Sequence, residues 1–202
     1  MLYPEPIERL IERLSKLPGV GKKSATRLAF FLLNARSAYV ADLSRSIAEV
    51  KEKVRLCSAC FNITDIDPCR ICRDERRSRE TLCVVEEPSH LMVIESAFPG
   101  VYRYHILHGV IDPIEGIGPD EIKLPEMRER IAREGVKELI IATNPTIEGN
   151  TTAHYIVETT RSLNVKITRI ASGVPIGGDI VYTDPLTIKS AVDNRRNLKD
   201  SP

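Results

Sequence analysis

The N-terminal part of the chain carries apolar residues at the spacing of α-helices. The spacing recurs every three or four positions at Ile7, Leu10, Ile11, Leu14 and Leu17, and Pro18-Gly19 then interrupts it. A second helical pattern covers residues 24–32, and a third covers about 40–54, from which Leu43, Ile47 and Val50 are expected to face inward. We expect a small helical bundle, too thin to be stable without the next module or another subunit.

From residue 81 onward the pattern alternates between strands and helices. Strands are predicted at 81–85, 102–107, 138–143 and 165–170, and helices at about 89–97, 125–134 and 151–163, with Gly135 ending the second helix. This alternation is typical of a mostly parallel sheet with helices on both faces. In such sheets the working residues lie just beyond the carboxyl ends of the strands. We therefore expect Glu86, His108 and the loop 144–148 to gather on one edge.

The last part of the chain is a glycine-rich turn followed by one helix. Residues 172–179 read Ser-Gly-Val-Pro-Ile-Gly-Gly-Asp, and Asp184-Pro185 is a capping signal for a helix to about Arg196. The apolar face of this helix consists of Leu186, Ile188, Ala191 and Val192. A face this short needs cover, and a swapped contact between subunits would bury it.

Between the helical and the alternating parts lie two Cys-x-x-Cys pairs. They consist of Cys57, Cys60, Cys69 and Cys72. Four thiolates at this spacing can surround a zinc ion tetrahedrally, and no competing ligand in the motif suggests an open catalytic position. The alternatives are two disulfides, or reduced cysteines without a metal. We predict a structural zinc, and we interpret Cys83, which lies in an apolar run, as a small core residue.

Composition limits the classes of function. The chain has 202 residues, 42% of them hydrophobic, and a formal net charge of +1. A nucleic-acid site must therefore come from local clustering of charge. No apolar run approaches the roughly 20 residues that span a membrane, and the N-terminus does not resemble a signal peptide, so we expect a cytosolic protein.

The segment 17–24, Leu-Pro-Gly-Val-Gly-Lys-Lys-Ser, has three interpretations. A Walker A loop would need glycine at Lys16 and a strand before it. A plain corner between two helices would have no ligand. A helix-hairpin-helix would bring backbone N–H groups and the cations of Lys22, Lys23 and Arg27 to a DNA phosphate, without sequence choice.

The flanks of the cysteine motif are locally basic. They carry Lys51, Lys53, Arg55, Arg70, Arg73, Arg76, Arg77 and Arg79. This cluster suits either a second phosphate-binding surface or a solvated hinge partly neutralised by Asp74, Glu75 and Glu80.

Together these motifs resemble a known family. A glutamate after the first strand and an acidic glycine loop after a later strand resemble the Toprim domain of topoisomerases, primases and some nucleases. Preceded by a helix-hairpin-helix and a four-cysteine module, the whole chain resembles the RecR recombination mediators. The segments 17–24, 142–149 (Ala-Thr-Asn-Pro-Thr-Ile-Glu-Gly) and 173–179 are specific matches. The family describes part of the last as Walker B-like, but without a P-loop we prefer a structural role for it.

One departure from the Toprim enzymes bears on activity. In those enzymes an Asp-x-Asp pair follows the third strand and helps to hold magnesium. Here Asn144 and Thr146 occupy these places and supply no carboxylate. Glu86 and Glu148 alone make a thin metal site, and Tyr102 and Tyr104 are interpreted as strand residues rather than nucleophiles. We predict a protein that is not an enzyme; the alternative is a magnesium-dependent Toprim nuclease or topoisomerase-like enzyme.

The resemblance implies an α+β multidomain chain in which DNA binding and partner binding belong to different domains. The expected parts are a helix-hairpin-helix region (1–54), a zinc finger (55–77), a Toprim domain (78–173) and a C-terminal turn and tail helix (174–202). It implies a ring-shaped homotetramer on single- and double-stranded DNA, with RecO and RecF as partners in loading RecA. The expected DNA-binding residues are Gly19, Gly21, Lys22, Lys23 and Arg27. The expected partner-binding residues are Glu86, Glu87, Asn144 and Glu148.

Overall fold

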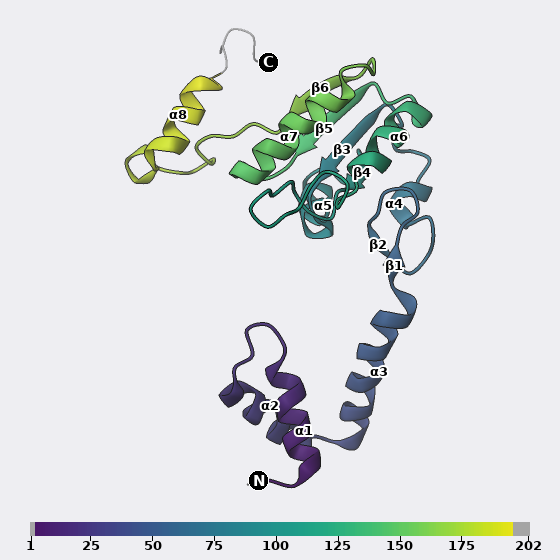
Figure 1. Cartoon of the computed structure of the whole chain (residues 1–202), viewed down its shortest axis with the longest axis vertical. Helices are drawn as coiled ribbons and strands as arrows, with labels where there is room; N and C mark the ends of the chain where they lie inside the picture. The colour runs from purple at the N-terminus through teal and green to yellow at the C-terminus, as the bar shows by residue number, and fades with distance from the viewer. Residues whose placement is uncertain (1–2, 196–202) are drawn as a thin grey trace. The chain divides into compact units, whose positions relative to one another are not determined.

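A computed structural model describes residues 3–195 of the chain. It divides into two compact units, Met1–Val54 and Arg55–Pro202. Figure 1 labels the helices and strands of each.

The first unit is helical, as the pattern predicts. It contains α1 (Glu5–Ser15), α2 (Lys22–Asn34) and α3 (Ser37–Lys53). Its core lies between α1 and α2, where Ile11 packs against Ala25 and Ala29. The two alanines present no long side chain, which allows a close approach of the two helices.

The inward orientation predicted for the third helix is wrong within this unit. Leu43, Ile47 and Val50 are 36%, 65% and 59% exposed, and α3 has no buried residue. The core of the unit is formed by α1, α2 and the loop between them, so it leaves the apolar face of α3 uncovered.

The second unit is built on a four-stranded sheet. Its strands are β3 (Thr81–Val85), β4 (Arg103–Ile106), β5 (Glu138–Ala142) and β6 (Lys166–Arg169). They lie in the order β4-β3-β5-β6, and all neighbours are parallel. The chain passes from β3 to β4 on one side and then crosses to β5 on the other side of β3. The strand order therefore reverses between β3 and β5, and open α/β sheets bind their ligands at such a point.

Both faces of this sheet are covered, as predicted. On one face Leu82 and Val84 pack with residues of α6 (Leu124–Glu134) and α7 (Ile147–Thr160). On the other, Cys83 and Val85 pack with α5 (Pro88–Ala97) and with the cysteine module. Figure 1 shows these helices beside the strands. Cys83 is 1% exposed, which confirms it as a core residue.

Two helix ends can be compared with the sequence patterns. Gly135 ends α6 in the left-handed conformation, as predicted, with φ of 65°. By contrast, α7 begins at Ile147, four residues before the predicted start, because the side chain of Thr146 caps it by accepting the N–H of Gly149. Glu148 therefore lies in the first turn of a helix and not in a loop.

The cysteine module is small. It contains the antiparallel pair β1 (Arg55–Leu56) and β2 (Ile63–Thr64), followed by the one-turn α4 (Arg70–Arg73). Cys57, Cys60 and Cys69 belong to the same apolar cluster as the sheet residues Val85 and Ile106. The module is therefore packed on the sheet rather than free.

The C-terminal part contains η1 (Ile180–Tyr182) and α8 (Pro185–Asp193). Asp184 caps α8 by accepting the N–H groups of Leu186 and Thr187, as the sequence predicts, while the predicted end at Arg196 lies outside the described residues. Leu186 and Val192 are 79% and 54% exposed, so much of the apolar face of α8 is uncovered. Within residues 3–195, no helix combines the length and apolar character that crossing a membrane requires.

Candidate functional site

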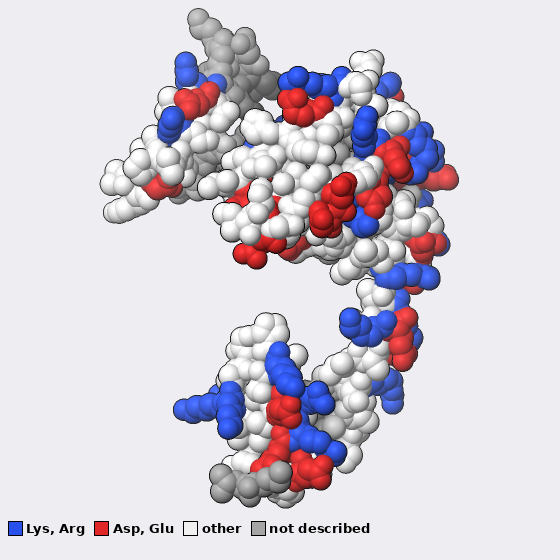
Figure 2. Space-filling view, in the orientation of Figure 1, with Lys and Arg blue, Asp and Glu red and all other residues white. Residues whose placement is uncertain are grey.

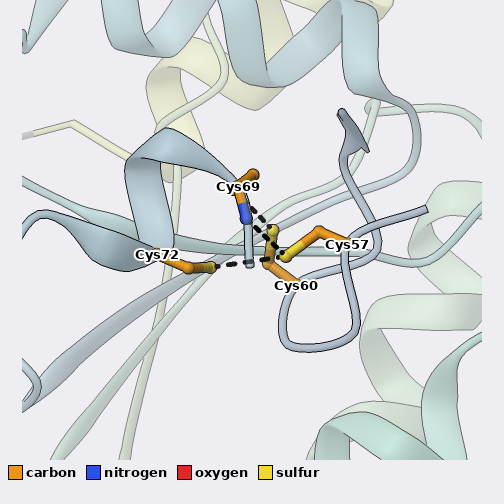
Figure 3. A group of neighbouring side chains, drawn as sticks. All are labelled: Cys57, Cys60, Cys69 and Cys72. Carbon is orange, nitrogen blue, oxygen red and sulfur yellow. Dashed lines mark hydrogen bonds between the residues drawn. The ribbon is translucent and has the colours of Figure 1, made fainter. Parts of the chain in front are cut away.

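The four paired cysteines converge, two from the loop after β1 and two from α4 and its N-cap (Figure 3). All four Sγ atoms lie within 4.8 Å of one another. The Sγ atoms of Cys60 and Cys69 are 3.5 Å apart, and those of Cys57 and Cys72 are 3.9 Å apart. A tetrahedron with Zn–S bonds of about 2.3 Å requires sulfur separations of about 3.8 Å, so the arrangement fits zinc.

The chemistry of the donors agrees with this fit. No cysteine of the described residues forms a disulfide. The contact between Cys60 and Cys69 raises the pKa of the first thiol and lowers the pKa of the second, since one proton is shared between two sulfurs. A zinc ion displaces such protons and binds all four groups as thiolates. The N–H groups of Asn62 and Cys69 further support the sulfurs of Cys60 and Cys57, at 3.5 and 3.2 Å.

The module also closes the edge of the sheet. β4 is an edge strand, and the N–H of Ile106 donates to the carbonyl of Cys60 at 2.9 Å. Two residues further along the chain, Nε2 of His108 lies 2.6 Å from the carbonyl oxygen of Phe61. His108 and Phe61 both have positive φ, 58° and 64°, which is uncommon for residues other than glycine. The position of the cysteine loop is thus fixed against the end of β4.

A buried arginine forms a second connection. Arg77 donates to the carboxylate of Glu95 on α5 at 2.6 and 2.8 Å and to the carbonyl of Tyr102 at 2.8 Å. The hydrogen bond from Arg77 lowers the pKa of Glu95 to about 2. This arginine therefore anchors the chain after the cysteine module on the sheet and is not available to a phosphate.

Other basic residues around the module are also engaged. Arg76 forms two hydrogen bonds with Asp74, and Arg70 pairs with Asp65 at 3.3 Å. Arg73 donates to the carbonyl of Asp67. These contacts partly neutralise the cluster, while the side chains of Arg70 and Arg76 remain 79% and 88% exposed.

The loop between α1 and α2 is open. Gly19 has φ of 77°, in the left-handed region, and a Cβ on Gly19 or Gly21 would meet no atom within 4 Å. Gly21 is the N-cap of α2, whose first turn has no acidic residue. The side chains of Lys22, Lys23 and Arg27 are exposed. A helix N-terminus with adjacent cations attracts anions. The helix before the loop argues against a Walker A site, which requires a strand there.

At the strand ends, the structure brings Glu86 and Asn144 together. The backbone N–H of Asn144 donates to one carboxylate oxygen of Glu86 and its side-chain Nδ2 donates to the other, both at 2.7 Å. Glu86 is 7% exposed. The side chain of His108 does not join them, because it is held at Phe61.

The other predicted residues of this edge are accessible. Glu87 is the N-cap of α5 and is exposed, and Glu148, in the first turn of α7, is partly exposed. Acidic side chains gather over α5 and the loop beside it in Figure 2. Glu87 and Glu148 are therefore the accessible carboxylates among these residues, whereas Glu86 is buried and holds the exposed Asn144.

Comparison with known proteins follows the same division of the chain. Residues 7–51 match the family described as RecR, helix-hairpin-helix, and residues 54–74 match the four-cysteine zinc finger domain of RecR. Residues 80–171 match the Toprim domain, and residues 173–196 match RecR, C-terminal. The chain is 48% identical to the Recombination protein RecR of Pelotomaculum thermopropionicum over 199 residues, which are 98% of each chain. The chain belongs to the RecR family.

Further members of the family are similar over their full lengths. The Recombination protein RecR of Myxococcus xanthus is 48% identical, covering 98% of this chain and 100% of the relative. That of Heliobacterium modesticaldum is 47% identical, covering 97% and 98%. The resemblance inferred from the motifs is confirmed. With the match to the RecR zinc finger and the convergent sulfurs, the four cysteines form a structural zinc site.

Proposed function

We propose that this chain is a non-enzymatic, DNA-binding mediator of recombinational repair. The observation that carries the proposal is the open N-terminus of α2, where Lys23 and Arg27, with Lys22 next, are exposed beside two glycines. Blue side chains project over α1 and α2 in Figure 2. Membership of the RecR family and its helix-hairpin-helix supports DNA as the source of the phosphates. Contacts to phosphates alone imply binding without sequence choice.

The test is a titration of fluorescent single-stranded and gapped DNA at several salt concentrations. Lys23→Glu combined with Arg27→Glu should weaken binding roughly tenfold or more and reduce the salt slope by about 2, because two phosphate contacts are lost. Zinc content should not change. The matched control is Arg9→Glu with Arg45→Glu, which makes the same charge change outside the loop and α2. Equal affinity of the two double variants would remove the DNA site from the hairpin loop.

We further propose that the strand-end edge binds a basic partner, with RecO and RecF as the candidates, and that this docking serves the loading of RecA. Glu87 and Glu148 offer accessible carboxylates there, and charge complementarity of this kind sets on-rate and specificity. Glu148→Ala should weaken binding of RecO in isothermal titration and leave DNA binding intact. Glu129→Ala removes an exposed carboxylate from α6 and serves as the control. Unchanged RecO affinity in Glu148→Ala would count against this surface.

A homotetramer is part of the proposal, supported by the uncovered apolar faces of α3 and α8. The absence of enzymatic activity is also proposed, since Asn144 and Thr146 provide no carboxylate at the strand ends. Incubation with end-labelled gapped DNA and Mg²⁺, followed by a denaturing gel, tests it. Intact DNA that is retarded on a native gel supports a scaffold. Cleavage that disappears in Glu86→Gln would instead support the alternative, a magnesium-dependent Toprim nuclease.

A further inference from the structure

Glu86 is a buried carboxylate whose two oxygens are both satisfied by one neighbour. Asn144 supplies its backbone N–H to Oε1 and its Nδ2 to Oε2, each at 2.7 Å, near the short end of the usual range. A buried charge must be compensated. Within 4 Å the described residues offer Glu86 one ionisable partner, His90, whose Nδ1 lies 3.8 Å from Oε2. The two N–H groups of Asn144 are therefore the main compensation.

Two helix N-termini reinforce this arrangement. Glu86 immediately precedes the N-cap of α5, and Oε1 faces the first turn of α7, where a Cβ on Gly149 would lie 3.0 Å away. The positive ends of both helices favour the negatively charged carboxylate here and disfavour a bound cation.

Toward α7 the space beside the carboxylate is occupied as well, although Asn144 itself is exposed. The same Cβ on Gly149 would lie 2.1 Å from the carbonyl oxygen of Asn144, so the helix turn packs directly on the loop. The loop is held further by Thr143, whose hydroxyl donates to the carbonyl of Gly149 at 2.9 Å. On its other side, a guanidinium nitrogen of Arg169 lies 3.4 Å from the carbonyl oxygen of Asn144. Mg²⁺ requires oxygen ligands at about 2.0–2.1 Å. Beside the Glu86 oxygens, the two amide nitrogens of Asn144 occupy the place that such a cation would need.

We propose that Asn144 takes the place of a divalent cation beside Glu86, so that this site is closed to Mg²⁺ and Mn²⁺ and acts as a clasp that holds residues 144–149 in position. The inference deepens the non-enzymatic part of the proposed function and rests on it. It does not depend on the DNA site. The clasp orients the loop that leads into Glu148, so it positions the accessible carboxylate of the edge.

The proposal predicts a gain of function from one substitution. Asn144→Asp keeps the backbone N–H on Oε1 but replaces the Nδ2 donor with a carboxylate oxygen that faces Oε2. Two carboxylates at this separation cannot both be ionised without a cation or a shared proton. The variant should therefore bind Mg²⁺ and Mn²⁺, whereas the wild-type chain should not.

The experiment uses the zinc-loaded full chain with MgCl₂ and MnCl₂ as probes, in isothermal titration and thermal denaturation. The Tm of wild type should be unchanged, and that of Asn144→Asp should rise by at least about 2 °C with either salt. The gain should disappear when Glu86→Gln is added. Asn150→Asp is the matched control: it adds a carboxylate to the same helix start, can still accept the hydrogen bond from Arg169, and should gain nothing.

The wild-type chain tests the proposal even where Asn144→Asp does not fold. Its Asn144 amide should exchange slowly with solvent and faster in Glu86→Gln, with no effect of Mg²⁺ on either. Saturable Mg²⁺ binding by wild type that Glu86→Gln abolishes would overturn the proposal, as would a folded Asn144→Asp without added metal affinity. Neither result would alter the outcome for Lys23 and Arg27, so failure of the clasp and failure of the DNA site are distinguishable.

Discussion

The cysteine module and the N-terminal helical unit are both too small to be stable on their own apolar cores, and they differ in what the chain provides for them. The module is covered: three of its cysteines are no more than 3% exposed and lie in one cluster with Val85 and Ile106 of the sheet. The helical unit leaves α3 without a buried residue. Small domains need a metal, a covalent link or a partner surface to compensate for a thin core.

The two parts therefore obtain their stability from different sources. The module combines zinc with connections to β4 and the residues on either side of it, through Cys60, Phe61 and Arg77. In the helical unit, the edge-on contact between Tyr39 of α3 and Phe31 of α2 leaves most of the apolar face of α3 exposed. Disruption of the module should destabilise a single chain, whereas, on the proposal that another copy covers α3, disruption of its apolar face should weaken association.

The largest effect is expected from loss of a zinc ligand. Cys60→Ser should abolish zinc binding and lower the free energy of unfolding by at least about 4 kcal/mol, because metal binding supplies folding free energy to such modules. It should also release the amide of Ile106, which donates to the carbonyl of Cys60. Zinc analysis and hydrogen exchange measure both. Cys83→Ala, at a buried cysteine that is not one of the four zinc ligands, should retain the zinc. Continued protection of the Ile106 amide in zinc-free protein would contradict the coupling.

A smaller effect is expected at the second connection. The side chain of Glu95 is 20% exposed, and Arg77→Met removes its main partner. The cost should be about 2–3 kcal/mol, below the about 3–5 kcal/mol for fully buried pairs, since some solvent reaches the carboxylate. Urea unfolding measures it. The control is Arg161→Met, whose pair with Glu158 is exposed and should contribute less than about 0.5 kcal/mol.

The same pair predicts a dependence on pH. The folded pKa of Glu95 is lowered from 4.5 to about 2 by its hydrogen bond with Arg77. A lowered folded pKa gives stability that is fully present above the unfolded value and is lost as the pH falls from about 4.5 toward 2. Urea unfolding from neutral to acid pH should show this loss in wild type. The slope should be shallower in Arg77→Met, and equal slopes would show that the pair does not contribute.

Much of this arrangement can be predicted from sequence because it depends on local spacing. β3 has the predicted bounds, Gly135 ends α6, and the four thiols of the two Cys-x-x-Cys pairs lie together as predicted. These features depend on periodicity, backbone conformation or short loops, which the sequence displays directly. The predicted orientation of α3 is wrong because periodicity identifies an apolar face but not the surface that covers it.

The strand-end site shows the same limit at the scale of atoms. The fold rule correctly brings Glu86 and Asn144 to one edge, but it does not reveal that both carboxylate oxygens face the same asparagine. The same rule predicts His108 at this edge, but its side chain turns to the carbonyl of Phe61, 47 positions earlier in the chain. Such long-range pairs have no local signal. The one available hint is Gly149, whose lack of a side chain permits the close approach to Asn144.

At the C-terminus a modest effect is expected, because α8 depends on local interactions. Asp184 accepts the N–H groups of Leu186 and Thr187 at 3.0 Å each. Asp184→Ala should destabilise this helix by about 1 kcal/mol, while Asp184→Asn, which keeps a capping oxygen, should cost far less. Amide exchange in α8 measures the change. Equal protection in the two variants would mean that cover from another surface, rather than the cap, holds the helix.

The smallest effect within one chain is expected at the uncovered face of α3. Ile47 is 65% exposed, so Ile47→Gln should change the free energy of unfolding of the isolated chain by no more than about 0.5 kcal/mol. If this face is covered by another copy, the same substitution should promote dissociation in analytical ultracentrifugation, because it places an amide in an apolar contact. Ser44→Gln, on an exposed position of the same helix, is the control. Unchanged association in Ile47→Gln would mean that copies of the chain do not meet at the face of α3. The helical unit would then have to be stabilised by something other than a second chain at this face.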